Sequence, residues 1–378
     1  MKLLFLLGSR GEWGYIKPII DICRTKKIKY SICATNMVLL PSYGSLINEI
    51  RNQKYNIDYE IDMALEGSNY FTMVKSLGVF FTSFIDVLKT SKPDWLILAG
   101  DRGEQLMGAV SAAYTYIPVA HIQAGERSGN IDGVTRHAIS KFCHLHFTSN
   151  KDSETRLIKM GEEKFRVKNV GAPQIDDMIK NHENLNVLFI KKKFNIDLNL
   201  PYALVLQHPV TEEFNNVETQ INTLIDGLKI FKHKKIWILP NIDAGSEIIK
   251  NELLSKRSSE TIIFKNISRE IYLFLLKNSS FVIGNSSSGI LEAPTYRVPA
   301  INIGTRQRDR VQGKNVINCE FNKNEIKKSI QKALSNNFKK KLKTCSNPYG
   351  KGNSSIKIID ILLNQKIDQN FLIKKQTY

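Results

Sequence analysis

The fold is decided by the stretch LILAGDRGEQLMGAVSAAYTYIPVAHIQAGERSGNIDGVTRHAISKFCHLHF, which runs from Leu96 to Phe147. Three short apolar runs in and around it have the length and composition of buried strands, at Trp95–Ala99, Ile117–Ile122 and Leu145–Thr148. The two segments between these runs have the apolar spacing of amphipathic helices. This alternation predicts a parallel sheet with helices packed against it.

Charged side chains follow the first two of these strands. The carboxyl ends of parallel strands open onto the crevice where α/β proteins bind ligands. One such residue could be a loop salt bridge or a helix cap, and Asp132 could cap a helix that begins near Val134. Seven of them on two adjacent strand ends instead indicate a site: Asp101, Arg102, Glu126, Arg127, Asp132, Arg136 and His137.

The same alternation covers most of the chain and occurs twice. It runs from a strand at Lys2–Leu7 to one at Phe165–Val170, and it starts again at Tyr202–Gln207. The segment from His182 to Leu200 is polar and rich in lysine and asparagine, as domain linkers are, and 378 residues exceed one usual core. We therefore predict an α/β protein with Rossmann-like domains at residues 1–180 and 201–363, and a tail at 364–378 that frays or packs back on the first domain.

The second half carries its own candidate site. The turn Gly284–Gly289 (GNSSSG) joins a strand to a helix, where backbone N–H groups and hydroxyls can approach an anion. It has neither the Gly-Lys-Ser/Thr of a P-loop nor the spacing of a dinucleotide fingerprint. Glu292 is within reach of a ribose diol or faces solvent, and His208 is a structural histidine or a phosphate contact. Arg306 and Arg310 pair with phosphate or form surface salt bridges.

Composition narrows the partners and the location. The net charge is +18, but the lysines are spread along the chain and do not interleave with aromatic residues, so we expect no nucleic-acid partner. The start MKLLFLLGSRGEW has too short an apolar run for a secretory signal, and no stretch approaches the ~20 apolar residues of a membrane span. The five cysteines are scattered without a CxxC. These features predict a cytoplasmic protein with free thiols and no membrane partner.

A metal site has a weak signal. His144 and His146 alternate along one strand, with His121 and His137 near them in sequence, but no HExxH motif or cysteine partner accompanies them. Core or interface histidines are the favoured interpretation, and no metal is expected.

Several long motifs, in the same order over about the first 320 residues, resemble the UDP-N-acetylglucosamine 2-epimerases. They are GSRGEWG at 8–14, GDRGE at 100–104, HIQAGERSGNIDGVTRHAISK at 121–141, QHPVT at 207–211, PNIDAG at 240–245 and GNSSSGILEAP with VPAINIGTRQ at 284–307. The ID…RH…K pattern and the QHPVT and PNIDAG segments look more like the hydrolysing branch, which feeds sialic and legionaminic acid synthesis, than like the non-hydrolysing branch.

The resemblance implies two Rossmann-like domains facing across a cleft, the glycosyltransferase-B arrangement, in homodimers or homotetramers. It implies that the first domain holds the sugar and the catalytic acids, and that the second binds the nucleotide. The family's catalytic positions fall on Asp101 and Asp132, with Arg102 beside them. Its phosphate positions fall on Arg10, His208, Ser287 and Ser288, and its ribose position on Glu292. The further substrate-binding candidates are Gln123, Arg136, His137, Asn241, Asp243, Asn285, Ser286 and Arg306 in the matched motifs, and Arg310 in the loop after the last motif.

One position departs from the family. The family often has Glu where this chain has Gln123, and a neutral amide cannot serve as acid or base. That role must move, be dispensed with or pass to Glu126.

The expected reaction converts UDP-N-acetylglucosamine, or a related UDP- or GDP-linked acetamido sugar, to the free 2-epimer and nucleoside diphosphate. It needs a positioned base, and charge neutralisation of the leaving diphosphate, for which His208 and Arg10 are candidates, but no cofactor. The alternatives are a non-hydrolysing 2-epimerase, an acceptor-dependent glycosyltransferase of the same fold, and a nucleotide-sugar sensor without turnover.

Overall fold

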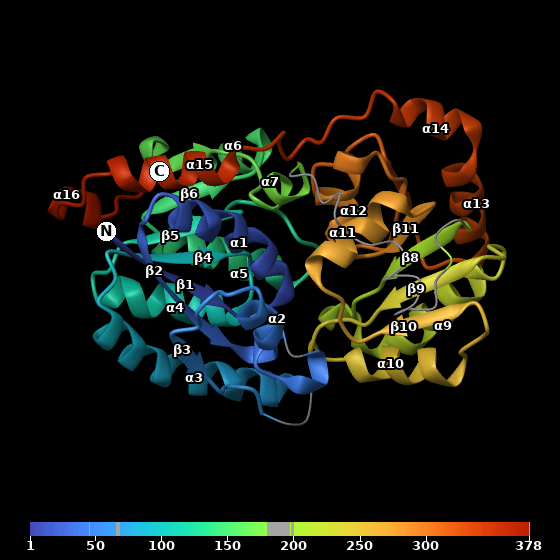
Figure 1. The fold of residues 1–378 in the computed structure, drawn as a ribbon, viewed down its shortest axis with the longest axis horizontal. Coiled ribbons are helices and arrows are strands. Elements are labelled where there is room, and N and C mark those ends of the chain that lie inside the picture. The colour runs from blue at the N-terminus through green and yellow to red at the C-terminus, as the bar shows by residue number, and fades with distance from the viewer. Residues whose placement is uncertain (45, 66–68, 180–196, 198–199, 378) are drawn as a thin grey trace. The chain divides into compact units, whose positions relative to one another are not determined.

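The computed structural model describes residues 1–44, 46–65, 69–179, 197 and 200–377 (Figure 1). They form two compact units. The first unit comprises Met1–Arg127, Ile131–Ile179 and Tyr349–Tyr378, and the second comprises Ser128–Asn130 and 180–348. The linker expected at 182–200 lies, apart from residues 197 and 200, outside the described residues.

The first unit is built on a parallel sheet of seven strands. Its spatial order is β3 (Tyr59–Ile61), β2 (Lys29–Thr35), β1 (Lys2–Leu7), β4 (Trp95–Ala99), β5 (Val119–Ile122), β6 (Leu145–Thr148) and β7 (Val167–Asn169). The helices are α1 (Arg10–Thr25), α2 (Leu46–Asn52), α3 (Tyr70–Ser91), α4 (Gly103–Tyr114), α5 (Ile131–Phe142), α6 (Lys151–Lys159), α7 (Gln174–Ile179), α15 (Ser354–Asn364) and α16 (Gln369–Leu372).

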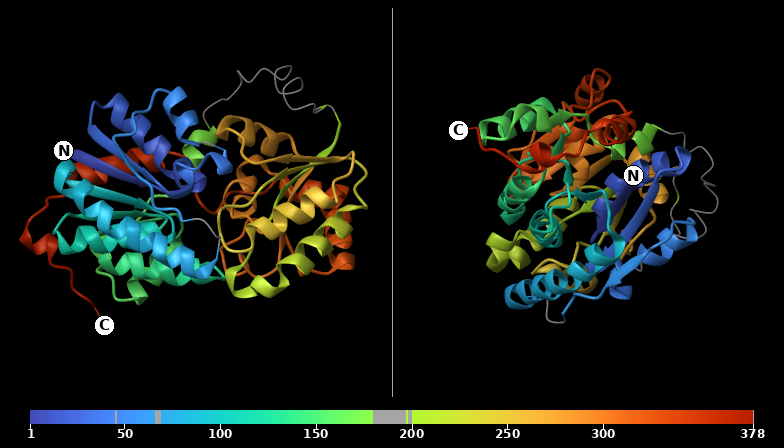
Figure 2. Two further views of the ribbon diagram at one scale, coloured as in Figure 1. Left: turned by 90° about the horizontal axis from the view of Figure 1, so that it is seen from below. Right: turned by 90° about the vertical axis from the view of Figure 1, so that its left-hand side faces the viewer.

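Both faces of this sheet are apolar because both are covered by helices (Figure 2). Along β1, Leu3, Phe5 and Leu7 pack into one core with α1 and α15, while Leu4 and Leu6 pack into the other with α3, α4 and α5. This explains why β1 is a continuous apolar run in the sequence and not an alternating one.

The second unit repeats the architecture with a parallel sheet of six strands. Its order is β10 (Thr261–Phe264), β9 (Lys234–Ile238), β8 (Tyr202–Leu206), β11 (Phe281–Gly284), β12 (Ala300–Ile303) and β13 (Val316–Cys319). The sequence pattern did not predict β13. The helices are α9 (Val217–Leu228), α10 (Ser246–Ser255), α11 (Arg269–Asn278), α12 (Ser288–Leu291), α13 (Lys323–Leu334) and α14 (Asn336–Leu342).

The chain returns to the first unit at Tyr349, so the second unit ends at Pro348 and not at residue 363 as expected. Asp176 explains the return, since its carboxylate accepts hydrogen bonds from Ser354 N (3.0 Å) and Ser355 N (2.7 Å) at the start of α15. The apolar side of α15 then enters the core beside α1, as the red helix on that unit shows in Figure 1.

Helix α3 is more apolar than expected from the sequence, in which no stretch was judged to approach the length of a membrane span. It is the one helix in the described ranges that is long and apolar enough to span a membrane by length and composition, with a mean hydropathy of 1.5 over a window that is 28% buried. Phe80, Phe84 and Leu88 pack on the sheet, as in the core helix of an α/β unit. Its outer face leaves Phe71 and Val74 exposed.

Candidate functional site

The strand order places the candidate residues at a topological switch point in each unit. In the first, β1 lies between β2 and β4, and the helices that follow β1 and β4 pack on opposite faces of the sheet. In the second, β8 lies between β9 and β11. Ligands of open α/β sheets bind outside the carboxyl ends of such strands. We call the carboxyl ends of β1, β4 and β5 the first edge, and those of β8 and β11 the second edge.

Asp101 and Arg136 form an ion pair at the first edge. Asp101 follows β4, and Arg136 comes from the buried side of α5 and is 2% exposed. The same guanidinium donates to the carbonyl oxygen of Gln123 at 3.1 Å. Burial opposes the charge of Arg136, but the carboxylates of Asp101 and Glu126 outweigh it and raise its pKa. The pair thus holds a carboxylate in place at the strand end.

Gln123 is buried with a left-handed backbone (φ 59°), and its Nε2 has no hydrogen-bond partner among the described residues. A buried donor without an acceptor is costly unless a ligand supplies one. The geometry therefore fits a substrate contact and not an acid or base.

The carboxylate of Glu126 accepts hydrogen bonds from neighbouring side chains. Its Oε1 accepts hydrogen bonds from Ser149 Oγ (2.6 Å), Asn150 Nδ2 (2.7 Å) and Ser153 Oγ (3.0 Å), and the residue is 1% exposed. Three donors on one oxygen stabilise the carboxylate where it is and join β5 to the start of α6. This arrangement argues against the catalytic role considered for Glu126 and favours a positioning role.

The remaining first-edge residues lie on the same loops and helices. Asp132 is in the first turn of α5, one turn before Arg136. Arg102 is the N-cap of α4, and its Nε donates to Glu104 Oε1 at 3.2 Å. Burial lowers the pKa of Arg10, at the start of α1, to about 10. Burial and the charges of Arg136 and neighbouring cations lower the pKa of His137 to about 4.

The other histidines near this edge bond to the protein itself. His121 Nε2 lies 2.7 Å from the Gly100 oxygen, His144 Nδ1 accepts from Val119 N at 3.1 Å, and His146 Nε2 lies 3.0 Å from Glu162 Oε2. The described residues contain no cluster of three or more histidine, cysteine or acidic side chains suited to a metal ion. The five cysteines are free and buried.

At the second edge, Asn285 holds the backbone of His208. Its Oδ1 accepts from His208 N at 2.7 Å and its Nδ2 donates to His208 O at 2.8 Å. Asn285 is fully buried, so it supports the loop after β8 and is poorly placed for the ligand contact that was predicted. Gly284 makes this approach possible, because a Cβ there would lie 2.1 Å from the Leu206 oxygen, and its φ is 131°.

The serine turn leads into a hydrogen-bonded chain of side chains. Ser286 Oγ accepts from Ser288 N (3.4 Å), and Ser287 is the N-cap of α12. Ser288 Oγ donates to Glu292 Oε2 at 2.6 Å and also bonds the hydroxyl of Tyr272. Glu292 directly follows the short α12, and Pro294 comes two residues later, where it disfavours a longer helix.

Glu292 is engaged on both oxygens. Arg269 Nη1 donates to its Oε1 at 2.7 Å, in addition to the bond from Ser288. Sequence reasoning missed Arg269 and Tyr272, whose only signal is their spacing of one helical turn on α11. A ribose diol would have to share or replace these partners.

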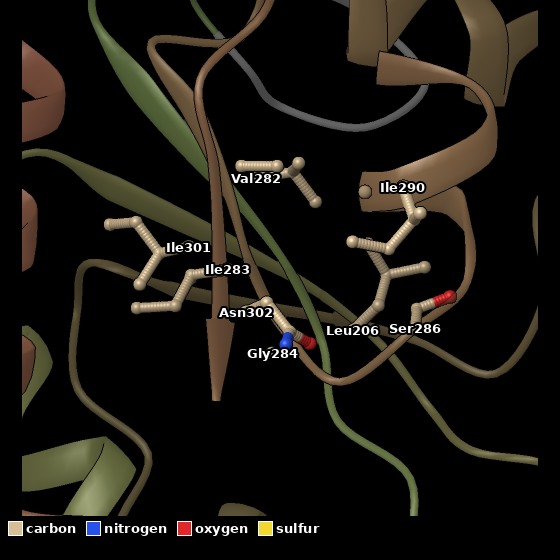
Figure 3. Close-up of a pocket in the computed structure, with 10 residues that line it drawn as sticks. Leu206, Val282, Ile283, Gly284, Ser286, Ile290, Ile301 and Asn302 are labelled. Atoms are coloured by element: carbon tan, nitrogen blue, oxygen red, sulfur yellow. The ribbon is translucent and has the colours of Figure 1, made fainter. Parts of the chain in front are cut away.

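The other second-edge candidates are dispersed around the turn. Arg306 Nη1 donates to the Asn285 oxygen (3.1 Å), and Arg310 Nη2 donates to Ser128 Oγ (3.1 Å). Asn241 and Asp243 lie in the loop between β9 and α10. Beneath the turn, a cavity of about 10 Å³ is lined by side chains that include Leu206, Val282, Ile290 and Ile301 (Figure 3). It holds at most about one water, so this void is too small for a nucleotide.

Comparison with known proteins adds the identity of the family. The family described as UDP-N-acetylglucosamine 2-epimerase matches residues 21–363. The chain belongs to the UDP-N-acetylglucosamine 2-epimerase family. The resemblance expected from the motifs is thereby confirmed.

Two relatives of this epimerase are named for the hydrolysing reaction. A UDP-N,N'-diacetylbacillosamine 2-epimerase (hydrolyzing) of Legionella pneumophila is 32% identical, over 100% of this chain and 99% of the relative. A GDP/UDP-N,N'-diacetylbacillosamine 2-epimerase (hydrolyzing) of Campylobacter jejuni is 34% identical, over 89% of this chain and 88% of the relative.

The solved structures agree in fold. The UDP-GlcNAc 2-epimerase of Neisseria meningitidis bound to UDP-GlcNAc superposes with a TM-score of 0.82 at 21% identity, covering 97% of this chain and 100% of that one. The Methanocaldococcus jannaschii enzyme with UDP-GlcNAc and UDP gives 0.81 at 22% identity, with the same coverage. These matches confirm the predicted two-domain α/β class of glycosyltransferase-B type for the epimerase.

Proposed function

We propose that this protein is a hydrolysing nucleotide-sugar 2-epimerase, which converts a UDP- or GDP-linked 2-acetamido sugar to the free 2-epimer and nucleoside diphosphate. The observation that carries the proposal is the Asp101–Arg136 ion pair at the switch point of a chain that belongs to the 2-epimerase family. The full-length match to a relative named for the hydrolysing reaction supports this branch over the non-hydrolysing one.

The reaction begins with removal of the C2 proton by a carboxylate. The C1–O bond to the diphosphate breaks, and a 2-acetamidoglucal forms. Water then adds to C1 while a proton returns to the other face of C2. Asp101 and Asp132 are the candidate carboxylates, and Asp132 shares a helix face with Arg136, one turn away. We assign no proton transfer to Glu126, whose carboxylate accepts three hydrogen bonds, or to Gln123, which is a neutral amide.

The two edges are proposed to take different parts of the substrate. Gln123 Nε2 supplies a buried donor for a hydroxyl or acetamido oxygen at the first edge. At the second edge the N-terminus of α12, with Ser286 and Ser287, and His208 are suited to the diphosphate, whose charge grows as it leaves. Arg10 is a further cation for this charge.

The substrate is proposed to be a diacetamido sugar or UDP-N-acetylglucosamine. The Legionella and Campylobacter relatives are named for diacetylbacillosamine, whereas a Neisseria meningitidis relative at 33% identity is named for UDP-N-acetylglucosamine. A role in sialic or legionaminic acid synthesis follows for either free product.

Proton NMR in deuterated water tests the proposal. The purified protein is incubated separately with UDP-N-acetylglucosamine and with UDP- and GDP-linked diacetamido sugars, without an acceptor. Free nucleoside diphosphate and a 2-epimer with deuterium at C2 are expected for one of them. A nucleotide-linked 2-epimer would identify the non-hydrolysing reaction, and no turnover with any substrate would overturn the enzyme proposal.

We also propose that the chain acts as a homodimer or homotetramer in the cytoplasm. The outer face of α3 carries exposed Phe71 and Val74, and Gly78, where an added Cβ would meet nothing within 4 Å. In an antiparallel pair of α3 helices, Lys75 would face the partner's Asp86. This charge complementarity favours a second copy of the chain as the partner that covers the outer face of α3. The five buried free thiols agree with a reducing compartment.

Light scattering of Val74→Asp tests the assembly. The variant should be smaller in solution than the wild type, because a charge replaces apolar contact area. Lys357→Glu, on exposed α15 surface, is the control. An unchanged mass for Val74→Asp would show that α3 does not form the interface. A monomeric wild type would overturn the proposal of an oligomer.

A further inference from the structure

Glu12 lies buried beneath the loop that leaves β1. Its Oε2 accepts hydrogen bonds from Gly8 N (2.5 Å) and Ser9 N (3.1 Å), while Ser9 Oγ accepts from Glu12 N. This is a capping box at the start of α1. The second oxygen, Oε1, is buried and has no hydrogen-bond partner among the described residues. The helix cap thus accounts for the position of Oε2 but not for the buried Oε1.

Glu104 approaches the same loop from the neighbouring strand. It lies in the first turn of α4, after β4, which pairs with β1. A Cβ on Gly8 would lie 2.1 Å from Glu104 Oε1, so the loop passes directly over this carboxyl group. Glu104 is 1% exposed and Glu12 is 2% exposed. Two buried carboxyl groups therefore meet at Gly8.

Charge decides which of the two carries a proton. Glu104 has a cation, since Arg102 Nε donates to its Oε1 at 3.2 Å. Burial, and then the charge of Glu104, raise the pKa of Glu12 well above its usual range, against the opposing effects of the Gly8 and Ser9 N–H groups and of Arg102. Two adjacent carboxyl groups in a buried site do not both ionise. Since Oε2 of Glu12 is already an acceptor, the proton belongs on Oε1.

We propose that Glu12 and Glu104 form a buried acid pair with one proton between them, and that this pair positions Arg102 and the Gly8 loop at the first edge. With the proton on Glu12 Oε1, the negative charge of the pair lies on Glu104, which bonds Arg102, the residue after Asp101 in the sequence. Both are positioning residues, and neither touches the reacting atoms. The consequence for catalysis rests on the proposed function, but the shared proton does not.

Infrared spectroscopy tests the shared proton without turnover. The wild type near neutral pH should show the carbonyl band of a protonated carboxyl group that shifts in deuterated water. This band should be missing from Glu12→Gln. In Glu104→Gln it should disappear at lower pH than in the wild type, because the neighbouring negative charge is gone. Glu154→Gln, an acid on α6, should keep the wild-type band. A wild type without the band, or a Glu12→Gln variant that keeps it, would overturn the pair.

Kinetics then test the positioning role. Raising the pH removes the shared proton and places a second charge under the loop, so kcat/KM should fall on the alkaline side in the wild type. Glu12→Gln replaces the hydroxyl by an amide donor and should lack this alkaline fall. Glu12→Ala should lose at least ~10-fold in kcat/KM, the effect of a lost buried hydrogen bond, and more than Glu12→Gln. Equal losses in both variants with the alkaline fall retained would leave Glu12 as a helix cap alone. A wild type inactive on every substrate would refute the proposed function, and the infrared result would stand.

Discussion

Arg136 connects the loop after β4 to the loop after β5, because its guanidinium pairs with the Asp101 carboxylate and donates to the Gln123 oxygen. A carboxylate that acts as a base must be held both charged and oriented. One buried arginine does both here, and it comes from the helix that also carries Asp132.

Replacement of Asp101 by Asn should lower kcat by at least ~100-fold, the scale of a lost acid–base group. Exchange of the C2 proton with deuterated solvent should fall with it. Asp152→Asn, which removes the exposed partner of Arg156 on α6, is the matched control and should keep wild-type turnover. Turnover of Asp101→Asn within a few-fold of wild type, in a folded protein, would rule out the base.

Glu126→Gln separates positioning from proton transfer. The amide cannot accept all three bonds from Ser149, Asn150 and Ser153 equally well, so the free energy of unfolding should drop by ~1–3 kcal/mol. Turnover should stay within about tenfold of the wild type if Glu126 does not move a proton. Urea unfolding and steady-state kinetics measure the two effects. A far larger loss of kcat at unchanged stability would return the acid–base role to Glu126.

Asn285→Ala should weaken nucleoside diphosphate binding. Both hydrogen bonds to the His208 backbone are lost, and the loop that presents the imidazole loosens, so Kd should rise about tenfold. Calorimetric titration with UDP and GDP measures this. Asn318→Ala, which removes a side-chain pair with Asn302 on β12 and β13, is the control. Equal effects of the two variants would mean that Asn285 serves the fold in general and not the site.

Acid should destabilise the first unit well before its exposed carboxylates titrate. Burial, followed by nearby cations, lowers the pKa of His144 from 6.5 to about 4, and burial does the same for His146. The unfolded chain takes up these protons first, so stability is complete above pH 6.5 and declines as the pH falls toward 4. Thermal unfolding between pH 7 and 4 checks the decline.

His144→Gln should flatten that decline, because glutamine can accept from Val119 N and donate without titrating. His233→Gln in the second unit should leave it unchanged. An identical pH dependence in wild type and His144→Gln would contradict the assignment.

The sheet and the two edges were predictable because buried parallel strands are continuous apolar runs, and because function gathers where they end. Lys2–Leu7, Trp95–Ala99 and Leu145–Thr148 have the predicted bounds. The place of α15 was not predictable in this way, since Ile358, Ile359 and Leu362 give the same apolar spacing whichever core receives them.

The roles of individual polar residues were harder to predict from the sequence. Whether Glu126 or Asn285 touches a ligand depends on partners that are distant in sequence, such as Ser149 and His208. Glu12 illustrates both what the sequence can predict and what it cannot. Its cap with Ser9 is visible as Ser-x-x-Glu, whereas its meeting with Glu104 depends on the pairing of β1 with β4.

The return of the chain at Tyr349 fixes an order of events during synthesis. Glu162, on the first unit, pairs with Lys374 as well as with Lys141, and Arg166 donates to the carbonyl oxygens of Phe371 and Ile373. A ribosome translates these partners only after the whole second unit. The unit that is begun first is therefore completed only after the second unit, and a nascent chain that stops at Pro348 can hold a finished second unit and a first unit whose buried charges still lack these additional partners.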